Sequence, residues 1–209
     1  MKTDDLIRAL ASDPLHAPSA GRRMALLLPV ALMGAGGALL GAIGLRSDLL
    51  AALLTPMTAV KYLLPLMLGG SALWLALRAA HPGQAVAARR LWAFAAVAAG
   101  VFVLRLAATA PADWGRGVMG HSAAFCVPAI CLASLVPLGA MLMALRNGAS
   151  PAPRRSGLLA GLAVGGFMTA IYALHCTEDD PLFFVTWYGL AILIVAGIGA
   201  LAGQRLLRW

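Results

Sequence analysis

The chain has 209 residues, of which 61% are hydrophobic and only 11% charged, and its mean hydropathy is +0.86. A soluble domain would carry about 25% charged residues, so this composition excludes an ordinary soluble protein. The net charge of +8 is not arranged as a basic stripe with interleaved aromatics, so direct nucleic-acid binding is not expected. Long unbroken apolar runs favour helices over a membrane barrel. The expected fold class is therefore all-α, an integral membrane bundle.

Residues 1–21 are polar and form a predicted N-terminal segment without a targeting signal. Thr3 is a plausible helix N-cap, which would place Asp4 and Asp5 in the first turn, where the helix dipole favours negative charge. Three residues at i, i+1 and i+4 would form one apolar edge, namely Leu6, Ile7 and Leu10. So short a helix is marginal alone and gains order by docking. A partner-binding segment and a simple tail or interfacial anchor both stay open.

Six apolar runs follow, each near the ~20 residues that a helix needs to cross ~30 Å of hydrocarbon. They cover residues 24–45, 57–77, 91–108, 122–145, 158–176 and 182–203. Together they predict a six-helix transmembrane domain over residues 22–209. Lys61 and Arg105 lie close enough to span ends for their side chains to reach water.

The Lys and Arg residues are unevenly divided between the two sides of this predicted bundle. Twelve flank the side of the termini, and four belong to the other side, namely Arg46, Lys61, Arg105 and Arg116. Because positively charged loops stay in the cytoplasm, this bias predicts that both termini are cytoplasmic.

Two of the three cysteines, Cys126 and Cys131, lie on the fourth span, and Cys176 ends the fifth. Five residues along a helix turn two side chains about 140° apart, so Cys126 and Cys131 are a poor pair. Cys126 is nearer in depth to Cys176, and spacing alone favours that pair. Pro128 and Pro137 would bend the fourth span and shift these depths. A lone membrane cysteine is usually a small apolar filler.

Cys176 is less ordinary because an imidazole and three carboxylates adjoin it, namely His175, Glu178, Asp179 and Asp180. Such a thiol could bind a soft metal or change oxidation state. The carboxylates themselves are expected to be merely solvated, with no matched nucleophile and base, so an enzyme is not expected.

No acidic residue lies in the middle of a span, so no proton or cation relay is indicated. A small-molecule or metal transporter of the inner membrane stays the alternative function, because Pro65 and Pro137 offer helix kinks around which a substrate site could form. Small-residue spacings on spans one, five and six favour close helix packing inside the bundle, while a homodimer through these faces stays open. The spacings are Gly37 and Gly41, Gly161 and Gly165, and Gly199 and Gly203.

Two segments and the six spans between them carry a family resemblance. The first is MKTDDLIRAL at residues 1–10, and the second is LHCTEDDPLF at residues 174–183, followed by WY at 187–188. Over essentially its whole length the chain resembles the NrsF-like family of multi-pass membrane anti-sigma factors, named as negative regulators of sigma F. The pattern His-Cys-x-Glu-Asp-x-Pro-Leu-Phe is the specific part of this resemblance.

The resemblance implies a protein that sequesters an extracytoplasmic-function sigma factor at the bacterial inner membrane. It implies that the sigma factor is released when two cysteines respond to heavy-metal or oxidative stress. Carried over by position, these are Cys131 and Cys176. The resemblance thus favours Cys131 over Cys126 as the partner of Cys176. Thr177 stands where a proline is expected, which should loosen the turn without removing the thiol.

The remaining expectations concern accessory residues and partners. Cys126, His175, Glu178 and Asp179 are candidate accessory groups at the sensing site. The sigma-binding residues would be Asp4, Asp5, Leu6, Ile7 and Leu10. No cofactor is obligatory, and a heavy-metal ion would act only as the signal.

Overall fold

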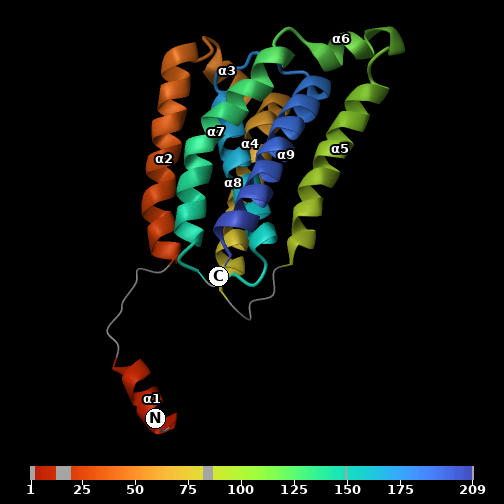
Figure 1. Ribbon diagram of the computed structural model, residues 1–209. Helices are drawn as coiled ribbons and strands as arrows, with labels where there is room; N and C mark the ends of the chain where they lie inside the picture. Colours follow the sequence, from red (N-terminus) through yellow and green to blue (C-terminus); the bar gives the residue numbers. More distant parts are fainter. Residues whose placement is uncertain (1–2, 13–19, 82–86, 149, 209) are drawn as a thin grey trace.

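The computed structural model describes residues 3–12, 20–81, 87–148 and 150–208, and this part of the chain is helical, without a strand (Figure 1). Six helices are long and apolar enough to cross a membrane, which confirms the predicted all-α class and number of spans. They are α2 (Ala20–Ile43), α4 (Pro56–Ala79), α5 (Trp92–Ala107), α7 (Ala123–Leu145), α8 (Pro153–Ala173) and α9 (Pro181–Leu206). Shorter elements are α1 (Thr3–Ala11), α3 (Leu49–Leu54), α6 (Trp114–Met119) and the 3₁₀ turns η1 (Ala88–Leu91) and η2 (Pro111–Asp113).

The fifth span differs most from its predicted bounds. It begins five residues earlier, at Pro153, because proline suits the first helical position and the following arginines extend the helix beyond its apolar part. It also ends at Ala173, three residues earlier than predicted. Cys176 therefore lies in the loop between α8 and α9 and not at the end of a helix.

Helix α8 is the centre of the bundle, with its flanks covered by α4, α7 and α9. Glycine allows α8 and α9 to approach closely, because a Cβ on Gly161 would lie 2.4 Å from the Val195 carbonyl oxygen. A Cβ on Gly199 would lie 2.4 Å from the Gly157 carbonyl oxygen. The α8 and α9 glycines thus serve packing within one chain, whereas a Cβ on Gly37 or Gly41 of α2 would meet nothing within 4 Å.

The bundle has two chemically different ends. At the first, which we call the loop end, α3, α6 and residues 174–180 lie together; residues 174–180 are named the acidic loop. At the second, the termini end, α2 begins and α9 ends, and Figure 1 shows α1 apart from the bundle beyond this end. Any chemistry of the acidic loop is therefore separated from α1 by the length of the spans.

Candidate functional site

Two buried thiols meet where α7 begins and the acidic loop passes over it. Cys126 is fully buried and Cys176 is 3% exposed, and the two side chains lie beside each other. The Tyr172 hydroxyl of α8 donates to Cys126 Sγ over 3.0 Å, and Ser122 Oγ lies 3.5 Å from the same sulfur. Neither cysteine forms a disulfide in this structure.

Cys131 occupies another face of α7. Its sulfur points toward the carbonyl oxygen of Ala191 on α9, at 4.0 Å, and the side chain is only half-buried. The structure therefore brings Cys126, and not Cys131, to Cys176. This is the arrangement that helical rise and rotation favour, and it differs from the pairing that the family resemblance implies.

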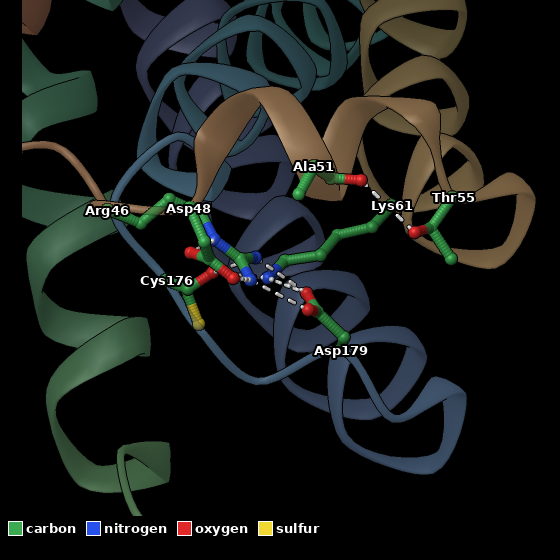
Figure 2. A network of polar contacts seen from close by, with 7 residues as sticks. All are labelled: Arg46, Asp48, Ala51, Thr55, Lys61, Cys176 and Asp179. Carbon is green, nitrogen blue, oxygen red and sulfur yellow. Dashed lines mark hydrogen bonds and ion pairs between the residues drawn. The ribbon is translucent and has the colours of Figure 1, made fainter.

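A fully buried lysine lies directly beside the thiol-bearing loop (Figure 2). Lys61 Nζ donates to the main-chain carbonyl oxygen of Cys176 at 2.5 Å and to Asp179 Oδ1 at 3.0 Å. The expectation that Lys61 reaches water was wrong, because its stem runs inward to these acceptors. The ammonium group is thereby paired inside the protein, which a buried charge requires.

Arg46, in the connection between α2 and α3, joins the same cluster (Figure 2). Its guanidinium donates to both oxygens of Asp179, at 2.8 and 2.9 Å, and to the Cys176 carbonyl oxygen at 3.2 Å. Asp48 accepts the remaining donors at 2.8 and 2.9 Å. Two cations from separate elements thus hold the main chain at Cys176 in place.

These charges set the protonation of the acidic loop. Burial would raise the pKa of Asp179, but its bonds to Arg46 and Lys61 outweigh burial and hold that pKa below the ordinary carboxyl value. Hydrogen bonding from Cys126 lowers the pKa of Cys176 to about 5, with Lys61 and the nearby Tyr188 hydroxyl assisting against burial. Cys176 is therefore the thiolate of the pair and the stronger nucleophile at neutral pH.

The other two carboxylates of the acidic loop are also engaged, so the expectation that they are merely solvated was wrong. Glu178 Oε1 accepts from the main-chain N–H of His121 at 2.7 Å and lies 3.2 Å from its ring Nδ1. Asp180 accepts from Arg105 at 2.9 Å and from the N–H of Leu182 at 2.9 Å, which caps α9. Each acid meets a different part of the bundle, so the loop fastens several elements together.

Glycine makes one of these contacts possible. Gly120 has φ +51°, a left-handed conformation, and a Cβ there would lie 2.5 Å from the ring of Phe183. The turn delivers the His121 N–H to Glu178. His175, at the other side of the loop, has Nδ1 3.0 Å from the Gly44 carbonyl oxygen.

These contacts bear on the accessory groups expected from the sequence. The side chains of His175, Glu178 and Asp179 are bound to other parts of the chain, and of the four accessory residues only Cys126 has its side chain beside the Cys176 thiol. Among the described residues no group of three or more His, Cys, Asp or Glu could hold a metal ion. The two thiols alone suit a soft ion of low coordination number, and Lys61, Arg46, Tyr172 and Tyr188 complete the site. A lysine within an apolar run was the signal by which sequence reasoning could have found Lys61.

The N-terminal segment forms a helix, as predicted. Helix α1 begins at Thr3, so Asp4 and Asp5 occupy its first turn, and Ile7 is 58% exposed. The side chains of Leu6 and Leu10 fall outside the described part of the chain, and the apolar edge stays a prediction.

Known proteins match this chain over its whole length. A profile of the family described as negative regulator of sigma F matches residues 9–209. The chain is 35% identical over 219 residues to a protein named probable anti-sigma-F factor NrsF of Azospira oryzae, and 36% identical over 216 residues to the anti-sigma-F factor NrsF of Caulobacter vibrioides. Both matches cover all of this chain and all of the relative, and no solved structure matches. With two full-length relatives and the family profile in agreement, the chain belongs to the family of negative regulators of sigma F.

Proposed function

We propose that this protein is a membrane anti-sigma factor, which holds an extracytoplasmic-function sigma factor at the bacterial inner membrane and releases it when thiols at the loop end react. The observation that carries the proposal is the full-length match to two relatives named as anti-sigma-F factors. Six membrane-spanning helices supply the membrane attachment. A transmembrane signal also needs a reactive group at one end and a binding segment at the other, and the thiol pair and α1 meet that requirement.

The sigma-binding surface is assigned to the termini end, which we place in the cytoplasm. Twelve of the sixteen Lys and Arg residues belong to this end. Helix α1 would dock on the sigma factor, with Asp4 and Asp5 meeting basic residues that the sigma factor otherwise uses on DNA. Ile7, with the predicted partners Leu6 and Leu10, would supply apolar contact.

The sensing step is assigned to Cys126 and Cys176. Oxidation would form one S–S bond, with two electrons passing to the oxidant and one proton leaving the Cys126 thiol, because Cys176 is already a thiolate. A soft metal ion would instead bind both sulfurs as thiolates and displace the proton of Cys126. Cys131 stays the alternative partner, because the family resemblance favours it by position.

The acidic loop would carry the signal away from the thiols. Lys61 of α4 and Arg46 before α3 both bind the Cys176 carbonyl oxygen, so displacement of this residue must shift or break those bonds. Coupling of the two ends requires that the two states bind the sigma factor with free energies differing by about 1–3 kcal/mol.

A sigma-dependent reporter, measured with and without cadmium or hypochlorite, tests the sensing step. Cys126→Ser and Cys176→Ser should each abolish induction, whereas Cys131→Ser should retain it. The opposite result for Cys126 and Cys131 would reassign the pair. Continued induction in the double variant Cys126→Ser/Cys176→Ser would overturn thiol sensing, provided that immunoblots show equal protein in the membrane.

Removal of residues 3–12 tests the sigma-binding segment separately. The reporter should become active without stress, and the sigma factor should no longer copurify with the membrane protein. Copurification at the full level after this deletion would move the binding surface to the basic loops around Arg89 and Arg154. Failure of the full-length protein to retain any sigma factor would overturn the anti-sigma function itself.

A further inference from the structure

Helix α5 is the one span that hardly packs against the rest of the bundle. None of its residues is buried, and Figure 1 shows it standing to one side of α9. Its fixed points lie near its ends, where Arg105 pairs with Asp180 and where η1 lies against α4. Between these points α5 leaves an open lateral cleft.

The cleft has a volume of about 670 Å³ and is lined by α4, α5, α8 and α9. Its wall is almost entirely aliphatic and aromatic, and its lining includes Phe94 and Phe102 of α5, Leu162 of α8 and Ile192 of α9. Lys61, which also lines it, binds the acidic loop with its charged group. Water has no set of polar partners in such a space, whereas the bilayer offers hydrocarbon beside it.

A second cavity, of about 780 Å³, lies at the termini end between the start of α8 and the end of α9. Three arginines line it, Arg154 and Arg155 from the first turn of α8 and Arg208 after α9. Among the described residues, no Asp or Glu lines this cavity. Three guanidinium groups around one space favour a phosphate, whose oxygens accept their paired N–H donors.

The two cavities share a wall at Leu158 of α8. Leu158 lies one turn beyond Arg154, so the basic cavity at the end of the bundle leads into the apolar cleft. A phosphate beside a long apolar channel matches a lipid with a charged head and an acyl chain. Basic pockets between transmembrane helices at the cytoplasmic face have this chemistry.

We propose that these two cavities form one binding site for an anionic phospholipid. Its phosphate lies among Arg154, Arg155 and Arg208, and an acyl chain fills the cleft between α5 and the pair α8–α9. The lipid then supplies the packing that α5 lacks from protein. The proposal is independent of the anti-sigma function, because it rests on other residues and requires neither the thiols nor α1.

Native mass spectrometry of the full-length protein in detergent tests the site with dioleoyl phosphatidylglycerol and dioleoyl phosphatidylcholine. We expect retention of phosphatidylglycerol and a higher melting temperature with it than with phosphatidylcholine. Arg154→Gln/Arg155→Gln/Arg208→Gln should weaken phosphatidylglycerol binding about tenfold or more and remove the preference. The matched control Arg89→Gln/Arg146→Gln/Arg205→Gln removes the same charge from the same end and should retain it. Equal loss in both triple variants would overturn a defined site.

The acyl chain is tested by filling the cleft. Ala99 lines the cleft and Ala96 does not, although both are exposed on α5. Ala99→Phe should reduce phosphatidylglycerol retention severalfold, whereas Ala96→Phe should leave it unchanged; equal retention in both would overturn the position of the acyl chain. Soluble glycerol phosphate should not raise the melting temperature. A rise equal to that with phosphatidylglycerol would show a free-anion site and overturn the lipid.

Discussion

A lysine inside an apolar helix costs free energy unless its charge is paired, and Lys61 shows how that pairing is arranged here. Its ammonium group is fully buried and lies between the Cys176 carbonyl oxygen and Asp179. The same charge stabilises the Cys176 thiolate. One residue therefore both positions the acidic loop and raises the reactivity of the thiol beside it.

Lys61→Met should make modification of Cys176 slower and more dependent on pH. In the unsubstituted protein the thiolate is already formed near neutral pH, because the pKa of Cys176 is lowered to about 5, so the rate with a methanethiosulfonate reagent should be nearly flat above that pH. In the variant the pKa of Cys176 should rise, because the charge of Lys61 is lost while the hydrogen bond from Cys126 remains, and the modification rate should fall most at mildly acidic pH. Peptide mass spectrometry gives the rate at Cys176 itself. Lys61→Arg should restore the modification rate at Cys176, and Arg116→Met should leave that rate unchanged. A rate in Lys61→Met that does not vary with pH would refute the role of Lys61.

Asp179→Ala should destabilise the protein, because it leaves Lys61 and Arg46 without their shared carboxylate. We expect the free energy of unfolding to fall by about 3 kcal/mol, as for a buried ion pair that loses one partner. Asp113→Ala is the matched control, since its pair with Arg116 is exposed and should contribute less than about 0.5 kcal/mol. Unfolding in mixed detergent micelles measures both, and equal losses would contradict the account.

Because the pKa of Asp179 is lowered, its contribution to stability should depend on pH. A carboxyl group with a depressed pKa in the folded state contributes its full stabilisation above the unfolded value of about 3.9. The contribution is lost as pH falls through the lower folded value. The free energy of unfolding that Asp179→Ala removes should therefore be constant above about pH 4 and should become smaller only below that pH. A difference that shrinks near neutral pH would exclude Asp179 as its source.

At the scale of whole elements, close packing of α8 and α9 is the main contact of the bundle. Gly199 and Gly197 lie on the same helix but differ in surroundings, which gives a matched pair of substitutions. A Cβ on Gly199 would overlap the Gly157 carbonyl, whereas a Cβ on Gly197 meets nothing within 4 Å. Gly199→Ala should lower the free energy of unfolding by about 1–3 kcal/mol. Gly197→Ala should be neutral or stabilise by up to about 1 kcal/mol; similar effects in both would show that the glycine contact is not needed.

The elements also mark how far sequence reasoning extends. Length and apolar character located all six spans, because a bilayer of fixed thickness demands nearly the same run from each. The short helices α3 and α6 lie between the predicted spans and were not predicted, since six residues carry too little periodicity to separate helix from turn. The early start of α8 at Pro153 was missed because a helix continues beyond the hydrocarbon wherever its backbone bonds allow.

For the molecule as a whole, the division of charge predicts an orientation. All four Lys and Arg residues of the loop end are paired with acids of that end, in pairs that join Arg46 and Lys61 to Asp179, Arg105 to Asp180 and Arg116 to Asp113. The excess positive charge therefore lies at the termini end, which we place in the cytoplasm.

Reporter fusions test this orientation. Alkaline phosphatase inserted after Ala112 should be active, because it would lie in the periplasm, and the same enzyme fused at the C-terminus should be inactive. Green fluorescent protein at the C-terminus should fluoresce. Activity of the C-terminal phosphatase fusion would reverse the orientation and would place the acidic loop in the cytoplasm.

The sequence by itself determined that the chain lies in a bilayer, that its fold is all-α and that it has six spans. These properties follow from the length of the apolar runs and from the need to pair every backbone group. Only the tertiary structure decided which cysteine meets Cys176 and what the acidic loop binds. Lys61 and Cys176 are 115 positions apart, and Arg46 and Asp179 are 133 apart. Such contacts depend on how each helix is rotated about its axis. Close glycine contacts and buried charges fix that rotation, whereas hydropathy does not.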